Sequence, residues 1–136
     1  MVFLGTLSVL DVEASPLRYY AMGDSYTIGT GIDLSESWPT QLASRLNQSG
    51  ISTRLVANLG QNTWTTQQVF EKQLPLIAEG QADFITLLIG VNDWLRGIAR
   101  STFRNRYREL LAEIRGRLSD PTKLLIITVP DFSCSP

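Results

Sequence analysis

The chain has 136 residues, which is enough for one domain with a real core and too few for two. Hydrophobic residues make up 43% of it and charged residues 18%, which excludes a disordered chain, and the net charge of −1 disfavours a basic nucleic-acid-binding protein or an acidic tail. The sequence contains no histidine and a single cysteine, Cys134, so an intrachain disulfide and a cysteine-rich metal site are excluded and the commonest general base is missing.

The N-terminal segment, residues 1–10, is apolar but far shorter than the roughly 20 residues that a membrane-spanning helix needs. As a signal peptide it lacks basic residues at its start, since the first arginine is Arg18. Asp11 and Glu13 also stand where a cleavage site would lie. We therefore expect residues 1–16 to be an N-terminal extension or a weak signal-like segment before the domain. A cytoplasmic location is favoured over export, and no stable membrane insertion is expected.

The first part of the domain predicts a strand, a glycine-rich turn and a helix. Residues 17–22 are typical of a strand, and the turn covers residues 23–31. A helix is predicted over residues 38–47, capped by Ser37 at its start and stopped by Gly50 at its end.

Strands and helices continue to alternate through the middle of the chain. Residues 51–57 alternate apolar and polar side chains, which predicts a second strand. Thr65 or Thr66 can cap a second helix, which Pro75 disturbs. Residues 83–89 form a short apolar run, which is typical of a central strand in a parallel sheet.

A third helix and a fourth strand are predicted in the last third of the chain. The helix starts at Ser101 and is ended by Asp120 and Pro121, and residues 123–129 are interpreted as a buried strand. Spacings of three and four residues mark the core-facing side of the helix, which carries Phe103, Tyr107, Leu110, Leu111, Ile114 and Leu118.

The order of the predicted elements is β-α-β-α-β-α-β. This alternation implies parallel strands joined by right-handed crossovers, with helices on both faces of the sheet. The predicted fold class is therefore α/β, a three-layer α/β/α sandwich around a doubly wound parallel sheet in which strands two and three flank strand one. Ligands bind beyond the carboxyl ends of the strands in such a sheet, so residues at those ends are the candidates for a site.

Positive charge is concentrated in residues 96–117, which hold seven arginines against two glutamates. This concentration is compatible with a surface for phosphate or anionic lipid. The arginines at positions 100, 104, 108 and 115 also suit the solvated face of an amphipathic helix, which is the interpretation that we favour from the sequence.

The first predicted strand runs into segment 23–29, Gly-Asp-Ser-Tyr-Thr-Ile-Gly. A serine on a tight strand-to-helix turn exposes its hydroxyl and places its own N–H near a helix N-terminus, which suits a nucleophile with an attached oxyanion donor. Two other interpretations are open. Ser25 can be a plain helix cap, and the segment can be a phosphate-binding loop, although it lacks a Gly-Lys-Ser/Thr ending and the Gly-x-Gly-x-x-Gly spacing.

Polar residues also follow the second and third predicted strands. Segment 90–93, Gly-Val-Asn-Asp, follows the third strand, and the amide of Asn92 can donate to a developing oxyanion there. Segment 58–66 follows the second strand, and its backbone amides can face the same crevice. Asn and Asp are also ordinary turn residues, so each segment alone is a weak indication. The order of the segments and their shared position at strand ends make the combination specific.

Together these segments resemble the SGNH hydrolases, also called the GDSL esterase/lipase family, over about residues 17–135. Residues 23–25, Gly-Asp-Ser, are similar to the first sequence block of that family, and residues 90–93 are similar to its third block. The resemblance implies a flavodoxin-like fold with a five-stranded parallel sheet between helices. Residues 17–136 would then be the hydrolase domain, incomplete at its C-terminus and lacking the last strand and helix.

The resemblance also implies the roles of the site residues. Ser25 would be the nucleophile and Asn92 a donor of the oxyanion hole, with Gly23, Asp24 and Asp93 in supporting positions. Members of the family hydrolyse or transfer acyl groups without a metal. No metal or other cofactor is therefore expected, and the expected partner is a small ester or acyl substrate rather than a nucleic acid.

Two departures from the family pattern matter. The second block usually has a glycine at the position that is Thr63 here, where the backbone N–H is the third expected oxyanion donor. If the turn needs a positive φ there, threonine costs about 1–3 kcal/mol in strain. The fifth block, Asp-x-x-His, is missing before Pro136, and the remaining candidate bases are Asp24, Asp93 and Asp131. A carboxylate with a pKa of about 4 is a poor base for a hydroxyl.

We therefore expect an SGNH-type serine esterase or lipase that acts through an acyl-enzyme on Ser25, truncated in this chain and inactive for want of a base. The alternative is a non-catalytic remnant that binds small ligands in the same crevice. Self-association is also expected, because the strand at 124–129 would expose an apolar edge. Trp64 and Trp94 are candidates to line the pocket, although aromatic residues near strand ends more often serve packing.

Overall fold

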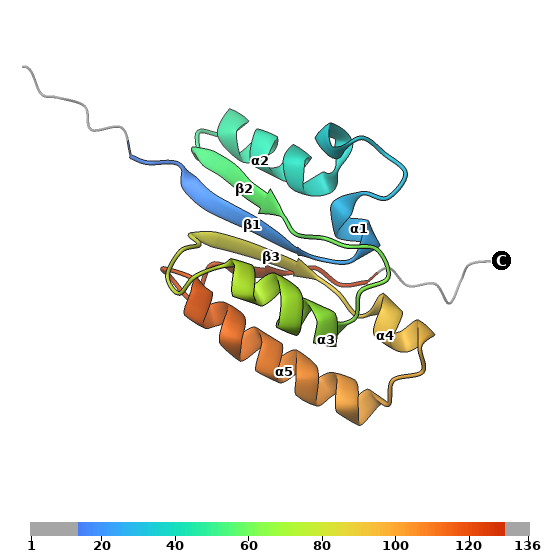
Figure 1. Cartoon of the computed structure of the whole chain (residues 1–136). Coiled ribbons are helices and arrows are strands. Elements are labelled where there is room, and N and C mark those ends of the chain that lie inside the picture. The colour runs from blue at the N-terminus through green and yellow to red at the C-terminus, as the bar shows by residue number, and fades with distance from the viewer. Residues whose placement is uncertain (1–13, 130–136) are drawn as a thin grey trace, which may run out of the picture.

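The computed structural model describes residues 14–129, so the expectations for residues 1–13, Asp131 and Cys134 lie outside the described residues. Four parallel strands form one sheet in the order β2-β1-β3-β4 (Figure 1). The predicted α/β class and the flanking of the first strand by the second and third are confirmed. The strands are β1 (Leu17–Gly23), β2 (Thr53–Asn58), β3 (Phe84–Leu88) and β4 (Leu124–Ile126).

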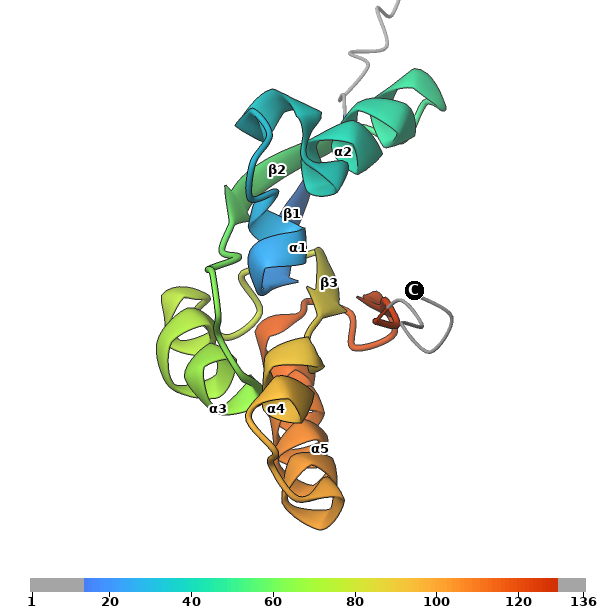
Figure 2. The same cartoon turned by 90° about the vertical axis from the view of Figure 1, so that its right-hand side faces the viewer.

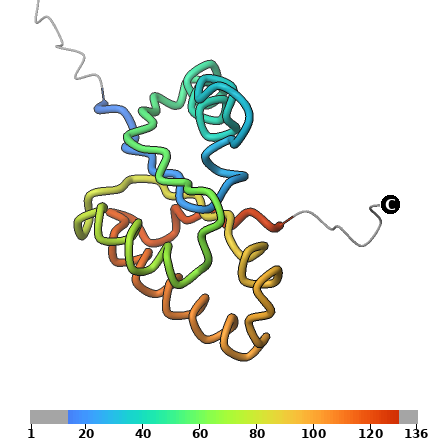
Figure 3. Tube along the Cα trace, turned by 45° about the vertical axis from the view of Figure 1, so that its right-hand side comes forward, coloured from blue at the N-terminus to red at the C-terminus, as the bar shows by residue number. Residues whose placement is uncertain are grey.

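Helices cover both faces of this sheet, as Figures 2 and 3 show. One face carries α2 and the other carries α3 and α5, while α1 and α4 lie at the carboxyl ends of β1 and β3. Short 3-10 segments span Leu34–Glu36 and Leu74–Leu76, and a π-helical segment spans Val69–Gln73. The α-helices are α1 (Ser25–Ile28), α2 (Trp38–Gln48), α3 (Thr66–Gln68), α4 (Val91–Leu95) and α5 (Arg100–Arg117).

The central strand β1 supplies side chains to two separate cores. Successive side chains of a strand point to opposite faces of a sheet. Tyr19 and Ala21 therefore pack with Ala43 of α2 on one face. Tyr20 and Met22 belong to the larger core on the other face, which also holds Val69, Leu74, Ile77, Leu87, Leu110 and Ile114.

The second helical region departs from a regular α-helix in the way that Pro75 predicts. Thr65 occupies the N-cap position of α3 and forms a capping box with Gln68. The helix then widens into the π-helical segment and ends as the 3-10 segment that contains Pro75. Proline has no N–H to donate and its ring crowds the preceding turn, which accounts for the change.

The predicted start of α2 after Ser37 is confirmed, whereas the capping by the Ser37 side chain and both predicted ends of α5 are wrong in detail. Ser37 holds the N-cap position of α2, but its hydroxyl donates to the carbonyl oxygen of Leu34 at 2.8 Å and caps no helix N–H. Helix α5 begins at Arg100 rather than Ser101 and ends at Arg117, before Asp120. It ends early because the chain turns there to bridge Ala82, with the N–H of Ser119 donating to the Ala82 carbonyl at 2.8 Å.

The fourth strand is shorter and less buried than the strand predicted over residues 123–129, and it has the exposed apolar edge that was expected at 124–129. Strand β4 has three residues and pairs with β3 alone within residues 14–129. Leu125 and Ile126 are 46% and 43% exposed, because no element among the described residues covers the outer side of β4. Self-association through this exposed edge stays a prediction.

None of the helices in the described part of the chain is long and apolar enough to cross a membrane.

An ion pair at the amino-terminal end of the sheet joins β1 to the loop before β3. The carboxylate of Asp83 accepts hydrogen bonds from Arg18 Nε and Nη2, at 2.8 Å each, and from the Arg18 backbone N–H. The hydroxyl of Ser119, after α5, donates to the same carboxylate. The hydrogen bonds from Arg18 hold the pKa of Asp83 well below its usual range, against the opposing effect of partial burial.

Asp83→Asn is expected to lower the urea midpoint of unfolding at neutral pH. Folding lowers the pKa of Asp83, so its contribution is present above the unfolded-state pKa of about 4 and is lost as the pH falls towards the folded-state pKa. The difference in midpoint between the wild-type chain and Asp83→Asn should therefore shrink between about pH 6 and pH 2. Glu79→Gln removes an exposed carboxylate nearby and is the control. A difference that stays constant with pH would contradict the assignment.

Candidate active site at the carboxyl ends of the strands

The three polar segments singled out in the sequence lie at the same edge of the sheet. Segment 23–25 follows β1, segment 58–66 follows β2 and segment 90–93 follows β3. Because β1 lies between β2 and β3 and all three strands are parallel, the three following loops are neighbours. Figure 2 looks onto these strand ends, with α1 and α4 on the side that faces the viewer. The chain reverses its winding direction between β1 and β3, which is where ligands bind in doubly wound sheets.

Gly23 brings the end of β1 into contact with the end of β3. Its φ of 153° and its surroundings both require glycine, since a Cβ would lie 2.2 Å from the Leu88 carbonyl oxygen and 2.3 Å from Thr27 Oγ1. The side-chain amide of the buried Gln73 pairs with both backbone groups of Gly23. Its Oε1 accepts from the Gly23 N–H at 3.0 Å and its Nε2 donates to the Gly23 carbonyl at 2.7 Å. This contact fixes the point from which Ser25 projects.

Ser25 is the first residue of α1 and is half-buried. Asp24 is the N-cap residue, and its Oδ1 accepts from the N–H of Tyr26 at 3.0 Å. The N–H groups of Thr27 and Ile28 donate to the Asp24 carbonyl oxygen. The Ser25 N–H has no acceptor within residues 14–129, as is usual in the first turn of a helix. Asp24 therefore caps α1, and the alternative in which Ser25 itself is the cap is wrong.

Asp24 and Asp93 are both buried, but their environments differ. Asp93 accepts from the Thr66 N–H at 2.9 Å and from the Thr66 hydroxyl at 2.6 Å, so both of its oxygens are used. Asp24 Oδ2 has no hydrogen-bond partner within the described residues. Burial raises the pKa of Asp24 above its ordinary value and the charge of Asp93 adds to the rise, while hydrogen bonding from the Tyr26 backbone opposes it. Neither carboxylate is exposed to solvent.

The loop after β2 packs directly on α1. The N–H of Leu59 donates to Ala21 and that of Gln61 to Gly23, and Asn58 Nδ2 donates to the Thr27 carbonyl at 2.8 Å. Gly60 is buried there, and a Cβ on it would lie 2.4 Å from the Ile28 backbone nitrogen. This loop is therefore held against the helix that Ser25 begins.

Thr63 has a φ of 65°, the only positive φ of a non-glycine residue in the described segment. The sequence had left open whether this position takes a left-handed backbone, and it does. Its carbonyl oxygen accepts from Arg96 Nη2 at 2.7 Å, which ties the loop to the residue just after α4. The Thr63 N–H has no acceptor among residues 14–129.

Asn92 lies in the first turn of α4 and is half-buried. Its Nδ2 donates to the Trp64 carbonyl oxygen at 2.9 Å, so its side chain contacts the residue next to Thr63. The turn predicted at 90–93 is thus the start of a short helix, with Gly90 as its N-cap residue. Of the two tryptophans proposed for the pocket, Trp64 is partly buried beneath the ammonium of Lys72, whereas Trp94 is 70% exposed.

Sequence reasoning missed the groups that hold these segments together. Gln73 and Arg96 had no assigned role, and Thr66 was considered only as a helix cap. Gln73 stands four residues after Val69, on the apolar face of its helical region. A polar residue on an apolar helix face indicates a buried hydrogen bond, and this pattern could have identified Gln73. Arg96 carried no comparable signal, because its partner is a backbone carbonyl remote in sequence.

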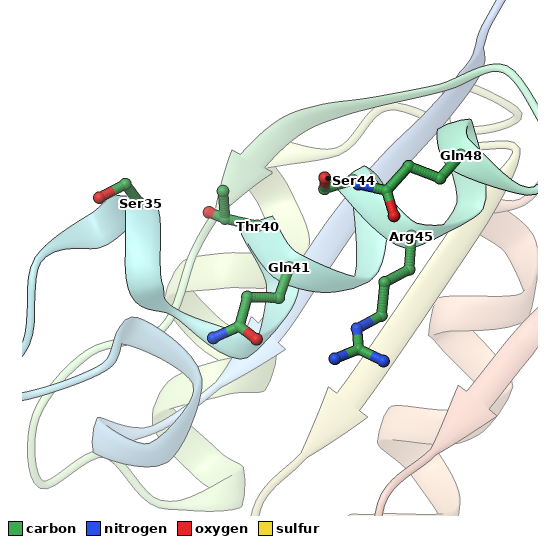
Figure 4. A pocket seen from close by; sticks show the side chains of 6 residues that line it. All are labelled: Ser35, Thr40, Gln41, Ser44, Arg45 and Gln48. Atoms are coloured by element: carbon green, nitrogen blue, oxygen red, sulfur yellow. Dashed lines mark hydrogen bonds between the residues drawn. The ribbon is translucent and has the colours of Figure 1, made fainter.

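A separate hollow lies along the outer side of α2 (Figure 4). It contains one charged side chain, Arg45, and none of the predicted site residues. Its lining residues are Ser35, Thr40, Gln41, Ser44, Arg45 and Gln48. Within residues 14–129 no cluster of three or more carboxylate or thiol side chains is arranged to hold a metal ion.

Residues 21–136 match the model of the GDSL-like Lipase/Acylhydrolase family. The chain is 25% identical over 123 residues to Esterase TesA of Pseudomonas aeruginosa, covering 90% of this chain and 59% of TesA. It is 26% identical over 105 residues to Thioesterase 1/protease 1/lysophospholipase L1 of Escherichia coli K12, covering 77% of this chain and 49% of that protein. The chain thus spans 59% of the length of one of these relatives and 49% of the length of the other.

Solved structures give the same result. The crystal structure of TesA superposes with a TM-score of 0.72 and 25% identity, over 88% of this chain and 64% of that one. AlinE4, described as an SGNH-hydrolase family esterase, superposes with a TM-score of 0.69 and 26% identity, over 85% of this chain and 59% of its own. The four-stranded sheet seen here is therefore that of the SGNH hydrolase fold.

Gln73→Met is expected to lower the free energy of unfolding by about 1–3 kcal/mol, because it leaves the buried N–H of Gly23 without an acceptor. Methionine keeps nearly the same volume, so the loss reports the hydrogen bonds. Gln67→Met, in the same helical region, is the matched control and should change stability by less than about 0.5 kcal/mol. Equal effects of the two substitutions in urea denaturation would argue against the contact at Gly23.

Asp24→Asn tests the buried carboxylate. Folding raises the pKa of Asp24, so the wild-type chain has the full stability from this group at low pH and loses it as the pH rises through the folded-state pKa. Relative to Asp24→Asn, the wild-type chain should therefore gain stability as the pH falls from about 7 to about 4. Glu113→Gln, on the exposed side of α5, controls for the change of net charge. A relative loss of wild-type stability over that range would refute the assignment.

Proposed function

The chain belongs to the GDSL-like lipase/acylhydrolase family, and from that premise we propose that its crevice binds small acyl esters and that Ser25 is the group they acylate. One observation carries the proposal. Ser25 begins a helix where the ends of β1 and β3 meet, and the segments of Thr63 and Asn92 lie on either side of it. Three sequence segments far apart in the chain thus supply one nucleophile and several N–H donors.

The proposed step is acyl transfer. Ser25 Oγ attacks the carbonyl carbon of the ester while a base takes its proton. The C–O bond to the leaving group then breaks, the base returns the proton to the leaving oxygen, and the acyl-enzyme and the free alcohol are formed. Negative charge develops on the carbonyl oxygen, which needs preorganised donors. The N–H groups of Ser25 and Thr63 are free of protein acceptors within residues 14–129. Asn92 gives one N–H to Trp64 and keeps the second N–H of its amide.

The backbone of Thr63 supports its part in this proposal. A left-handed threonine costs about 1–3 kcal/mol, and strain of this kind persists only where the surroundings enforce it. Arg96, the residue just after α4, holds the Thr63 carbonyl oxygen. Helix α4 itself carries Asn92, so α4 and the residue that follows it hold two of the three proposed donors.

We also propose that the 136 residues alone do not turn over esters, because they lack a base for Ser25. They contain no histidine, Asp93 uses both oxygens to hold Thr66, and Asp24 is buried. Ser25 then remains a weak alcohol nucleophile. Loss of one member of a serine triad leaves only about 10³–10⁴ of rate enhancement over water, supplied by the oxyanion donors and by binding.

The names of the relatives bear on the substrate class. TesA is called an esterase, and the Escherichia coli protein a thioesterase, protease and lysophospholipase. Small oxygen esters are the class that we propose for this chain, because TesA, which matches 90% of it, is named an esterase. The three proposed donors contact only the carbonyl oxygen of such a substrate. Binding of such ligands without turnover is the alternative, and the experiment below separates the two.

We expect the chain to hydrolyse p-nitrophenyl acetate and butyrate at the rate of Ser25→Ala when no base is added. Added imidazole should supply the missing base and produce a rate above that of Ser25→Ala at the same imidazole concentration. Asn92→Ala should lower this Ser25-dependent part by about tenfold or more, because one oxyanion donor is worth roughly 10²–10³ in a complete enzyme. Mass spectrometry should find the acyl group on the peptide that contains Ser25.

Ser44→Ala, on the exposed side of α2, is the matched control and should leave the imidazole-dependent rate unchanged. Equal rates of the wild-type chain and Ser25→Ala at every imidazole concentration would reject Ser25 as the acylated group. If such a chain still binds butyrate esters at equilibrium, the ligand-binding alternative replaces catalysis.

A further inference from the structure

Arginines form a stripe along the first half of α5. Arg100, Arg104 and Arg108 are spaced by four residues, are exposed, and line one open hollow together with Ser101 and Asn105. Between residues 94 and 108 the sequence has five arginines and no acidic residue. We call Arg100, Arg104 and Arg108 the arginine stripe.

No acidic side chain compensates this stripe within the described residues. The one ion pair found among residues 14–129 joins Arg18 to Asp83, at the opposite end of the sheet. Like charges four residues apart on a helix repel each other. The stripe also begins at the positive end of the helix dipole, where α5 has no acidic residue in its first turn and no side-chain cap. An anionic partner would relieve both effects.

Apolar side chains are exposed beside the stripe. Trp94 and Leu95, in the last turn of α4, are 70% and 66% exposed, and they are separated from Arg100 by a short connection. We call these two residues the apolar tip. A solvated helix face accounts for exposed arginines but not for an exposed tryptophan and leucine next to them.

The tip and the start of the stripe lie at one end of the molecule. Figure 1 shows α4 and the first turn of α5 together beyond the carboxyl end of β3, and Figure 2 shows α4 in front of α5 on the same side of the sheet. Asn92, of the proposed oxyanion hole, belongs to the helix that carries the tip. A surface that contacted the tip would therefore lie next to the strand-end loops that carry the proposed site.

We propose that the apolar tip and the arginine stripe dock this protein peripherally on an anionic lipid bilayer. The tip enters the interfacial layer, where tryptophan is favoured, and the arginines bind lipid phosphates. Docking goes beyond the proposed hydrolysis of esters and does not need Ser25. It would present the crevice to molecules dissolved in the bilayer surface.

A lipid surface fits these observations better than a nucleic acid. Arginine binds phosphate in both, so the stripe alone does not separate them. The exposed Leu95 has no partner in a nucleic-acid backbone, whereas the interface of a bilayer takes up leucine and tryptophan side chains together.

The test is sedimentation of the 136-residue chain with vesicles of phosphatidylcholine alone or mixed with phosphatidylglycerol. The chain carries Ser25→Ala, so that binding is measured apart from any reaction. We expect partition onto the anionic vesicles only, declining as salt is added. The triple variant Arg100→Gln/Arg104→Gln/Arg108→Gln should bind about a hundredfold more weakly, because each basic residue near an anionic leaflet contributes a factor of about five.

The matched control is Arg45→Gln/Arg54→Gln/Lys123→Gln, which removes three exposed charges elsewhere and should bind like the parent chain. Trp94→Ser/Leu95→Ser keeps all the arginines and should weaken vesicle binding by at least about fivefold while leaving binding to a DNA duplex unchanged. Circular dichroism checks that every variant is folded. The proposal is overturned if the parent chain binds both vesicle types equally or binds neither. It is also overturned if the two triple variants lose binding equally, or if Trp94→Ser/Leu95→Ser binds vesicles as tightly as the parent chain.

Discussion

The close approach of Gly23 to the end of β3 is the contact on which the site geometry depends. There is no room for a Cβ between Gly23 and the Leu88 carbonyl oxygen, and the amide of Gln73 uses both hydrogen-bonding groups of Gly23. Any displacement of β1 would break two buried hydrogen bonds, which is costly in a low-dielectric core. Ser25 follows two residues later, so its position is set by backbone packing and not by its own side chain.

The other segments of the site are attached to this fixed point by polar contacts. Asn58 and Gly60 join the loop after β2 to α1, and Asp93 joins α4 to the start of α3 through Thr66. Asn92 and Arg96 then connect α4 back to the loop that contains Thr63 and Trp64. The result is a closed set of contacts among three loops, which is how a short α/β chain can hold donors in place with few buried side chains.

The two ends of the sheet differ in charge arrangement. At the amino-terminal end Arg18 and Asp83 neutralise each other, and their ion pair links β1 to the loop before β3. At the carboxyl end two buried carboxylates, Asp24 and Asp93, lie inside while the arginines of α5 face solvent outside. Burial raises the pKa of Asp24, which stands directly before the proposed nucleophile.

The sequence by itself determined the alternation of strands and helices, the parallel sheet, and the placement of Ser25, Thr63 and Asn92 at strand ends, because these follow from local periodicity, turn residues and chain order. The resemblance to the SGNH hydrolases, in which this position is usually glycine, indicated residue 63 as the position to examine for a positive φ. Only the tertiary structure decided that Gln73 holds Gly23, that Arg96 holds Thr63, and that the strand predicted over residues 123–129 is limited to Leu124–Ile126. Each of these depends on which remote segment packs alongside, and hydrophobic patterns record the burial that a segment favours, not the neighbour that provides it.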